Sequence, residues 1–241
     1  MPEDLKIRKQ VYKDPRPAEM FGPYHDRVRR SVPEWPYEAV RVITVWLAVI
    51  FYRAQGSGAE RVPNGPVIIA PNHASFMDHF FAGAFLRRHI QFMAKSQMFG
   101  RHPLSWVFAH GGVFPVRRGH ADEEAFKTAF AVLTRGGAVG MYVEGGRSRS
   151  GEVGRQAKAG IGRLALQSGD PVVPVAILGA NRVRNWRRLR FPKIVVSYGE
   201  AVRFEQVDEP TREQQQACAD EILRRIRELH NELERKSSRR L

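Results

Sequence analysis

Short apolar runs alternate with amphipathic segments along most of this chain. The apolar runs predict strands at 66–70, 90–94, 113–116, 138–143, 172–178 and 193–198. The segments between and after them predict helices at 76–88, 97–110, 122–135, 157–168 and 211–235. In the last of these, Ile222, Ile226, Leu229 and Leu233 recur at helical spacing, so we expect it to cover a sheet with one apolar face. The alternation favours an α/β fold with a mostly parallel central sheet flanked by helices.

The part of the chain before this alternation has a different character. Residues 1–36 are rich in proline and charge without a sustained period, so they predict an irregular arm. A helix predicted at 37–54 contains the most apolar run, which as a helix is roughly 16 Å long and cannot cross a hydrocarbon core of about 30 Å. Its residues Trp46 and Tyr52 favour the headgroup zone, so it either lies in one membrane leaflet or packs as a buried helix.

A glycine-rich linker at 55–58 separates this helix from the rest. We therefore expect an N-terminal arm with an apolar interfacial helix at 1–58 and one main domain at 59–241. The hydrophobic content of 43% in 241 residues is enough for a sizeable core. The start of the chain mixes charges and does not resemble a secretory signal.

Charge and cysteine content narrow the possible partners. The net charge of +14 and the isoelectric point near 10.6 favour polyanions, such as nucleic acid, acidic lipid or phosphorylated metabolites. Cys218 is the only cysteine, which excludes a disulfide framework and a cysteine-rich zinc site. This composition fits a reducing cytoplasm.

His73 and Asp78 stand five positions apart, after the first predicted strand. On one continuous helix they would point roughly 140° apart and could not meet. They can meet if His73 lies in the preceding loop and Asp78 in the first helical turn. Ser75 is a good N-cap and would place Asp78 at the third helical position. The pair suits a general base, and the alternative is that Asp78 only completes a capping box.

A glycine-rich loop at 144–151 follows another predicted strand. It is not a Walker loop, because Glu152 stands where that motif needs lysine, and Ser150 replaces the last glycine of a nucleophile elbow. Its backbone N–H groups and Arg147 can hold a phosphate or carboxylate, with Glu144 able to fix the guanidinium group of Arg147. The alternative is a solvated turn with surface arginines.

Other polar groups offer weaker signals. Arg117 and Arg118 end a predicted strand and can clamp the same anion, or they form an exposed strand end. The basic run at 182–193 can meet lipid headgroups or nucleic acid, or be a solvated loop, and we favour lipid. Several histidines lack the spacing of metal ligands, so we expect no metal site. They are His79, His89, His102, His110 and His120.

Four blocks of this sequence, in order and spacing, resemble those of the glycerophospholipid acyltransferases. They are Asn-His-Ala-Ser-Phe-Met-Asp at 72–78, Phe-Pro-Val-Arg at 114–117, Glu-Gly-Gly-Arg-Ser at 144–148 and Val-Pro-Val at 173–175. The likeness covers roughly residues 60–200 and is strongest to 1-acylglycerol-3-phosphate (lysophosphatidic acid) acyltransferases of the PlsC type. One departure is Gly146, where that family usually has Thr or another small polar residue.

The resemblance implies a glycerol-3-phosphate acyltransferase-like αβ fold and a role for each matching residue. His73 would be the general base and Asp78 its orienting partner. The acceptor phosphate would be bound by Arg117, Glu144, Gly145, Gly146 and Arg147. Supporting roles fall to Ser75, Ser148 and Pro174, the last shaping the pocket wall.

The resemblance also implies the substrates. The donor would be acyl-CoA or acyl carrier protein, a co-substrate rather than a bound cofactor, and the acceptor 1-acylglycerol-3-phosphate, giving phosphatidic acid. We expect a peripheral or monotopic protein at an anionic membrane surface on the cytoplasmic face, with no nucleic acid bound. The alternatives are acylation of another lysolipid, or a basic membrane-surface or nucleic-acid-binding protein without catalysis.

Overall fold

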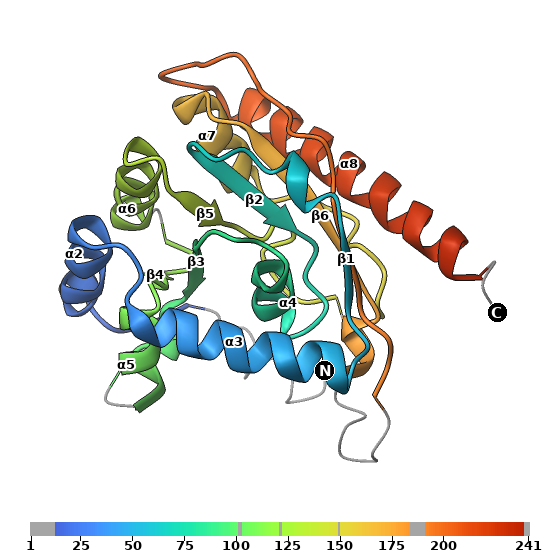
Figure 1. Cartoon of the computed structure of the whole chain (residues 1–241). Coiled ribbons are helices and arrows are strands. Elements are labelled where there is room, and N and C mark those ends of the chain that lie inside the picture. Colours follow the sequence, from blue (N-terminus) through green and yellow to red (C-terminus); the bar gives the residue numbers. More distant parts are fainter. Residues whose placement is uncertain (1–12, 101–102, 121, 149, 184–190, 239–241) are drawn as a thin grey trace, which may run out of the picture.

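The computed structural model describes residues 13–100, 103–120, 122–148, 150–183 and 191–238. Within these ranges the strands form one seven-stranded sheet of order β1-β7-β6-β2-β5-β3-β4 (Figure 1). They are β1 (Gln55–Ser57), β2 (Val67–Pro71), β3 (Ile90–Lys95), β4 (Phe114–Val116), β5 (Ala138–Gly140), β6 (Val172–Leu178) and β7 (Val195–Tyr198). The neighbours from β6 to β4 pair in parallel, whereas β7 is antiparallel to β6 and β1 follows the direction of β7. The predicted mostly parallel α/β fold is confirmed.

Helices cover both faces of this sheet (Figure 1). The α-helices are α2 (Gly22–Arg30), α3 (Trp35–Ile50), α4 (Asp78–Ala84), α5 (Pro103–His110), α6 (Glu123–Thr134), α7 (Ala159–Ser168) and α8 (Arg212–Ser238). Short 3-10 helices are η1 (Ala18–Phe21), η2 (Ala59–Arg61) and η3 (Ser96–Met98). The helix predicted at 76–88 is shortened to α4, and the one predicted at 97–110 becomes η3 and α5, with 101–102 outside the described residues.

Strand β2 shows why the sheet needs helices on both sides. Ile68 and Ala70 pack in the cluster that α6, α7 and α8 complete, whereas Val67 and Ile69 pack in the cluster of α3 and α4. Successive side chains of a strand point to opposite faces, so an uninterrupted apolar run fills two cores. The predicted apolar face of α8 is confirmed, since Ile222, Ile226 and Leu233 are buried.

The irregular arm expected at 1–36 is wrong for residues 13–36, the part of it that the structure describes. That part contains η1 and the helix α2, which buries His25 and Val28 and packs against α6. Pro23 lies in the first turn of α2, where a missing N–H costs no hydrogen bond. The prolines therefore mark where helices begin rather than an absence of structure.

The expected linker at 55–58 is also wrong, because residues 55–57 form β1 at the edge of the sheet, paired with β7. A Cβ atom at Gly56 would collide with the ring of Phe85. The glycine thus permits close packing within a strand, a use that glycine has where another group approaches the backbone.

Helix α3 combines a docked side with an exposed apolar side. Thr44 and Ala48 are buried against the domain, and Glu38 accepts a hydrogen bond from His89 Nε2 at 2.6 Å. Its exposed large apolar residues are Trp35, Val42, Ile43, Trp46, Leu47, Val49 and Ile50. Among the described residues, no helix has the length and apolarity needed to span a membrane.

Candidate active site

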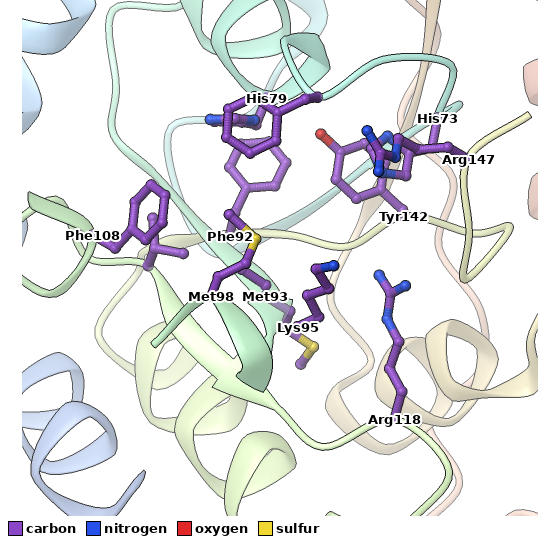
Figure 2. Close-up of a pocket in the computed structure, with 13 residues that line it drawn as sticks. His73, His79, Phe92, Met93, Lys95, Met98, Phe108, Arg118, Tyr142 and Arg147 are labelled. Atoms are coloured by element: carbon purple, nitrogen blue, oxygen red, sulfur yellow. The ribbon is translucent and has the colours of Figure 1, made fainter. Parts of the chain in front are cut away.

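The carboxyl ends of β2, β5, β3 and β4 meet around one cavity of about 120 Å³. The loop after β2 supplies His73 and the loop after β5 supplies Arg147. Lys95 at the end of β3 and Arg118 after β4 reach into the same space from below (Figure 2). His73 and Arg147, for which the resemblance implies roles as base and phosphate-binding residue, thus line the same cavity.

His73 and Asp78 form a hydrogen-bonded pair at the mouth of α4. His73 Nδ1 lies 2.8 Å from Asp78 Oδ2, and that oxygen also accepts the backbone N–H groups of Ala74 and Ser75, each at 2.7 Å. Because an ionised carboxylate only accepts, Nδ1 carries the proton and Nε2 is left as the acceptor of the imidazole. The pair therefore has the arrangement of a general base with an orienting carboxylate.

The expected capping of α4 is wrong, although the meeting that it predicted does occur. The N-cap residue is Met77 rather than Ser75, and Asp78 is the first residue of α4 rather than the third. Ser75 Oγ instead accepts the backbone N–H of Met77 at 3.2 Å. Since the carboxylate of Asp78 draws in two backbone N–H groups of the loop, the segment before it forms a turn and the helix begins later.

Glu144 ties two loops together instead of fixing Arg147. Its Oε1 accepts the backbone N–H of His73 at 2.9 Å, and its Oε2 accepts that of Gly154 at 3.0 Å. Burial raises the pKa of this carboxyl group, with the charge of Asp78 adding to the rise, while both N–H donors and the charge of Arg227 oppose it. Glu144 thus does not fix the guanidinium group of Arg147, as was expected. It instead joins the backbone at His73 to the backbone at Gly154.

The other predicted site residues of this loop differ in conformation and contacts. Gly145 has a φ of 63°, in the left-handed region, whereas Gly146 has open space where a Cβ atom would stand. Ser148 donates its backbone N–H to the carbonyl oxygen of His73, and its hydroxyl lies 3.0 Å from that of Ser150. Among the described residues of the loop, only Arg147 lines the cavity.

Arg118, rather than Arg117, faces the cavity. The guanidinium group of Arg117 donates to the carbonyl oxygen of Arg16 at 2.9 Å, and its backbone N–H donates to Asp122 at 2.6 Å. Strand β4 has ended here and a turn follows, in which the carbonyl oxygen of Arg117 accepts the N–H of His120 at 3.2 Å, so the two neighbouring arginines take different directions. The structure does not bring Arg117 to the site.

Two aromatic residues of the cavity were missed by sequence reasoning. The ring of Tyr142 stacks on that of His73 with centroids 3.8 Å apart and planes inclined by 20°. His79 lines the same cavity, and burial together with the charge of His73 lowers its pKa from 6.5 to about 4. His79 directly follows the block at 72–78, and Tyr142 lies just before the block at 144–148. This closeness in sequence is the signal that could have identified both residues as part of the site.

Pro174 does not form a wall of the cavity. It lies buried in β6, pairs with Ala70 of β2, and its carbonyl oxygen accepts the N–H of Gly199 at 2.8 Å. In the basic run at 182–193, residues 184–190 lie outside the described residues. Within the described ranges no cluster of three or more His, Cys, Asp or Glu side chains is placed to hold a metal ion.

A second, largely apolar cavity of about 170 Å³ adjoins the first. It lies among residues of α3, α4 and α5, and the two cavities share His79, Phe92, Phe108 and Val113 in their linings. The cavity that holds the base and the cations therefore lies next to a more strongly apolar one.

Comparisons with known proteins show which proteins this chain resembles. A family model described as "Acyltransferase" matches residues 53–178. The 1-acyl-sn-glycerol-3-phosphate acyltransferase of Bacillus subtilis is 27% identical over 169 residues, 69% of this chain and 82% of that protein. The chloroplastic 1-acyl-sn-glycerol-3-phosphate acyltransferase BAT2 of Brassica napus is 26% identical over 165 residues, 66% of this chain and 46% of that protein. The chain thus spans about half the length of this plant relative.

A solved structure, that of the 1-acyl-sn-glycerophosphate acyltransferase PlsC from Thermotoga maritima, has the same fold. It aligns with a TM-score of 0.61 and 24% identity, covering 83% of this chain and 80% of that one.

Proposed function

Because the chain belongs to the acyltransferase family, we propose that it moves a fatty acyl group from acyl-CoA or acyl carrier protein to the free hydroxyl of 1-acylglycerol-3-phosphate, giving phosphatidic acid. One observation carries the proposal. The pair of His73 and Asp78 opens into the same cavity as the cations of Lys95, Arg118 and Arg147.

The base performs the proton transfers of a direct acyl transfer. His73 Nε2 takes the proton of the acceptor hydroxyl as that oxygen attacks the thioester carbonyl carbon. The new C–O bond forms, the C–S bond breaks, and the imidazolium returns the proton to the leaving thiolate. General base catalysis of this kind is worth about 10²–10⁴-fold, and no covalent acyl-enzyme is needed.

The cations hold the acceptor in place. A phosphate monoester carries about −1.5 to −2 charges near neutral pH, so Lys95, Arg118 and Arg147 match it in charge. A phosphate fixed there keeps the free hydroxyl beside His73, which replaces a random encounter with an oriented one. In this proposal Lys95 and Arg118 join Arg147 in binding the acceptor phosphate, and Arg117, to which the resemblance gave the same role, does not.

The apolar cavity and α3 suit the lipid parts of the substrates. The cavity among α3, α4 and α5 supports a site for an acyl chain, since its lining is mostly apolar. The exposed apolar side of α3, with Trp35 and Trp46, supports insertion into one leaflet. The net charge of +14 favours anionic lipid, which we propose is met at the cytoplasmic face by a peripheral or monotopic protein.

Thiol release from acyl-CoA, measured with and without lysophosphatidic acid, tests the proposal. The wild type should release thiol only with the acceptor, His73→Ala should lose at least about 100-fold in turnover, and Arg147→Ala should mainly raise KM for the acceptor. If Asp78→Asn lowers only the melting temperature while turnover stays normal, the carboxylate serves the loop and not the base. Equal turnover with lysophosphatidylcholine would contradict the proposal that Lys95, Arg118 and Arg147 recognise a phosphate monoester.

A further inference from the structure

Two buried polar atoms beside His73 have no hydrogen-bond partner among the described residues. They are Asp78 Oδ1 and the hydroxyl oxygen of Tyr142. The other oxygen of Asp78 receives the ring N–H of His73 and two backbone N–H groups, so the carboxylate is held on one side only. Asp78 is completely buried, and a charged oxygen without a donor is costly in such a place.

Tyr142 offers the matching donor. Its ring stacks on His73 on one side and is stacked with Phe92, with centroids 5.8 Å apart, which limits how the ring can turn. Burial raises the pKa of the Tyr142 hydroxyl well above 10.0, and the charge of Asp78 raises it further. The phenol therefore keeps its proton, and the negative group that acts on it is the carboxylate that lacks a donor.

We propose that the hydroxyl of Tyr142 donates a hydrogen bond to Asp78 Oδ1 through one bridging water molecule, and that Tyr142 is a positioning residue for the pair of His73 and Asp78. This inference rests on the proposed function, because it concerns the proposed base. The bond gives the second oxygen a donor and leaves Oδ2 directed at His73. The stacked ring at the same time fixes the plane of the imidazole.

The bond also changes how the pair takes up a proton. A donor on the carboxylate stabilises the pair most when His73 is neutral and Asp78 carries its full charge. Without this donor the pair binds a proton more tightly, so its apparent pKa rises. The acid limb of the rate profile, where the base becomes protonated, should then move to higher pH.

Tyr142→Phe tests this, because it keeps the stacked ring and removes only the hydroxyl. We expect kcat to fall about tenfold with KM for lysophosphatidic acid unchanged, and the acid limb of kcat to move upward in pH. Tyr198→Phe is the matched control, since it also removes a buried hydroxyl, one that donates to the carbonyl oxygen of Ala82 at 2.8 Å. It should lower the melting temperature without moving the acid limb.

A second measurement does not depend on turnover. The titration of His73, followed by NMR with ¹⁵N-labelled histidine and assigned with His73→Gln, should shift upward in Tyr142→Phe and not in Tyr198→Phe. An unshifted His73 titration in Tyr142→Phe overturns the inference, even if kcat falls. If the titration shifts but the wild type does not acylate lysophosphatidic acid, the proposed function fails and the positioning contact stands.

Discussion

Ser148 donates its backbone N–H to the carbonyl oxygen of His73 at a distance of 2.7 Å. Glu144, four residues earlier in the same loop, accepts the backbone N–H of His73 at 2.9 Å. Both main-chain polar groups of the proposed base are therefore satisfied by the loop that also carries Arg147. The position of the base depends on the conformation of this loop, so changes in its glycines should reach the base without touching it.

Gly145→Ala should impair both folding and activity. Gly145 has a φ of 63°, and a Cβ atom there would stand 2.7 Å from Cγ of Lys158. A left-handed conformation costs an alanine about 1–2 kcal/mol, before any displacement of Lys158. Thermal unfolding should show the loss of stability, and thiol release should show a lower kcat because the loop no longer holds His73 in place.

Gly146→Ala is the matched control. It adds the same methyl group one residue later, where no atom lies within 4 Å of the new Cβ. The free energy of unfolding should change by less than about 0.5 kcal/mol. If both substitutions destabilised the protein equally, the left-handed conformation at Gly145 would not be the reason that this position needs glycine.

Arg118→Ala and Arg117→Ala should affect different properties. Arg118 lines the cavity, so its loss should raise KM for lysophosphatidic acid about tenfold or more. Arg117 contacts the carbonyl oxygen of Arg16, so its loss should lower stability by about 1 kcal/mol with little change in KM. Steady-state kinetics and thermal unfolding of both variants distinguish them, and the reverse result would restore the assignment made from the sequence.

The sequence predicted what depends on local pattern. The strands β2, β3 and β6 were placed within a residue or two, because their apolar runs are long and bounded by turn residues. The pairing of His73 with Asp78 followed from loop and helix geometry. Arg147 lines the cavity because the glycine-rich loop follows a parallel strand and lies at the edge of the sheet where such folds bind ligands.

The predictions that were wrong concern residues whose contacts lie far away in the sequence. The partner of Glu144 is a backbone N–H group 71 residues away, and that of Arg117 is a carbonyl group 101 residues away. Gly56 was predicted to belong to a linker. The reason for a glycine there, the close approach of the Phe85 ring, comes from a distant part of the sequence. Side-chain direction at the end of β4 has the same origin, since the contact with Arg16 draws Arg117 away from the cavity.

His79 should make stability depend on pH in a defined direction. Its pKa in the folded state is lowered from 6.5 to about 4, so the folded protein resists protonation that the unfolded chain accepts. The stabilising contribution of neutral His79 is present above pH 6.5 and is lost as the pH falls toward 4. His79→Phe removes this titration, so its melting temperature should decline less than that of the wild type between these pH values.

The same substitution at His120, which is exposed, is the control for the loss of a histidine. It should leave the pH dependence of the melting temperature as in the wild type. Parallel pH profiles for His79→Phe and the wild type would show that His79 is accessible to protons in the folded state.

The exposed apolar side of α3 should determine binding to membranes. Ile43 and Trp46 are 61% and 63% exposed, and both belong to the side that does not pack on the domain. Burying a large apolar side chain is worth about 1.5–3 kcal/mol, so Ile43→Glu with Trp46→Glu should weaken sedimentation with phosphatidylglycerol-containing vesicles about tenfold or more. The added negative charges act in the same direction, which makes a charge control necessary.

The control places the same two charges on α8, which lies across the sheet from α3 (Figure 1). Asn231→Glu with Ser237→Glu changes two exposed positions there and leaves α3 intact. If the apolar side is the contact, this variant should keep most of the vesicle binding, with only the loss that high salt also produces, because electrostatic attraction is screened by salt and apolar burial is not. Equal losses in the two double variants would mean that net charge, rather than α3, holds the protein at the lipid surface.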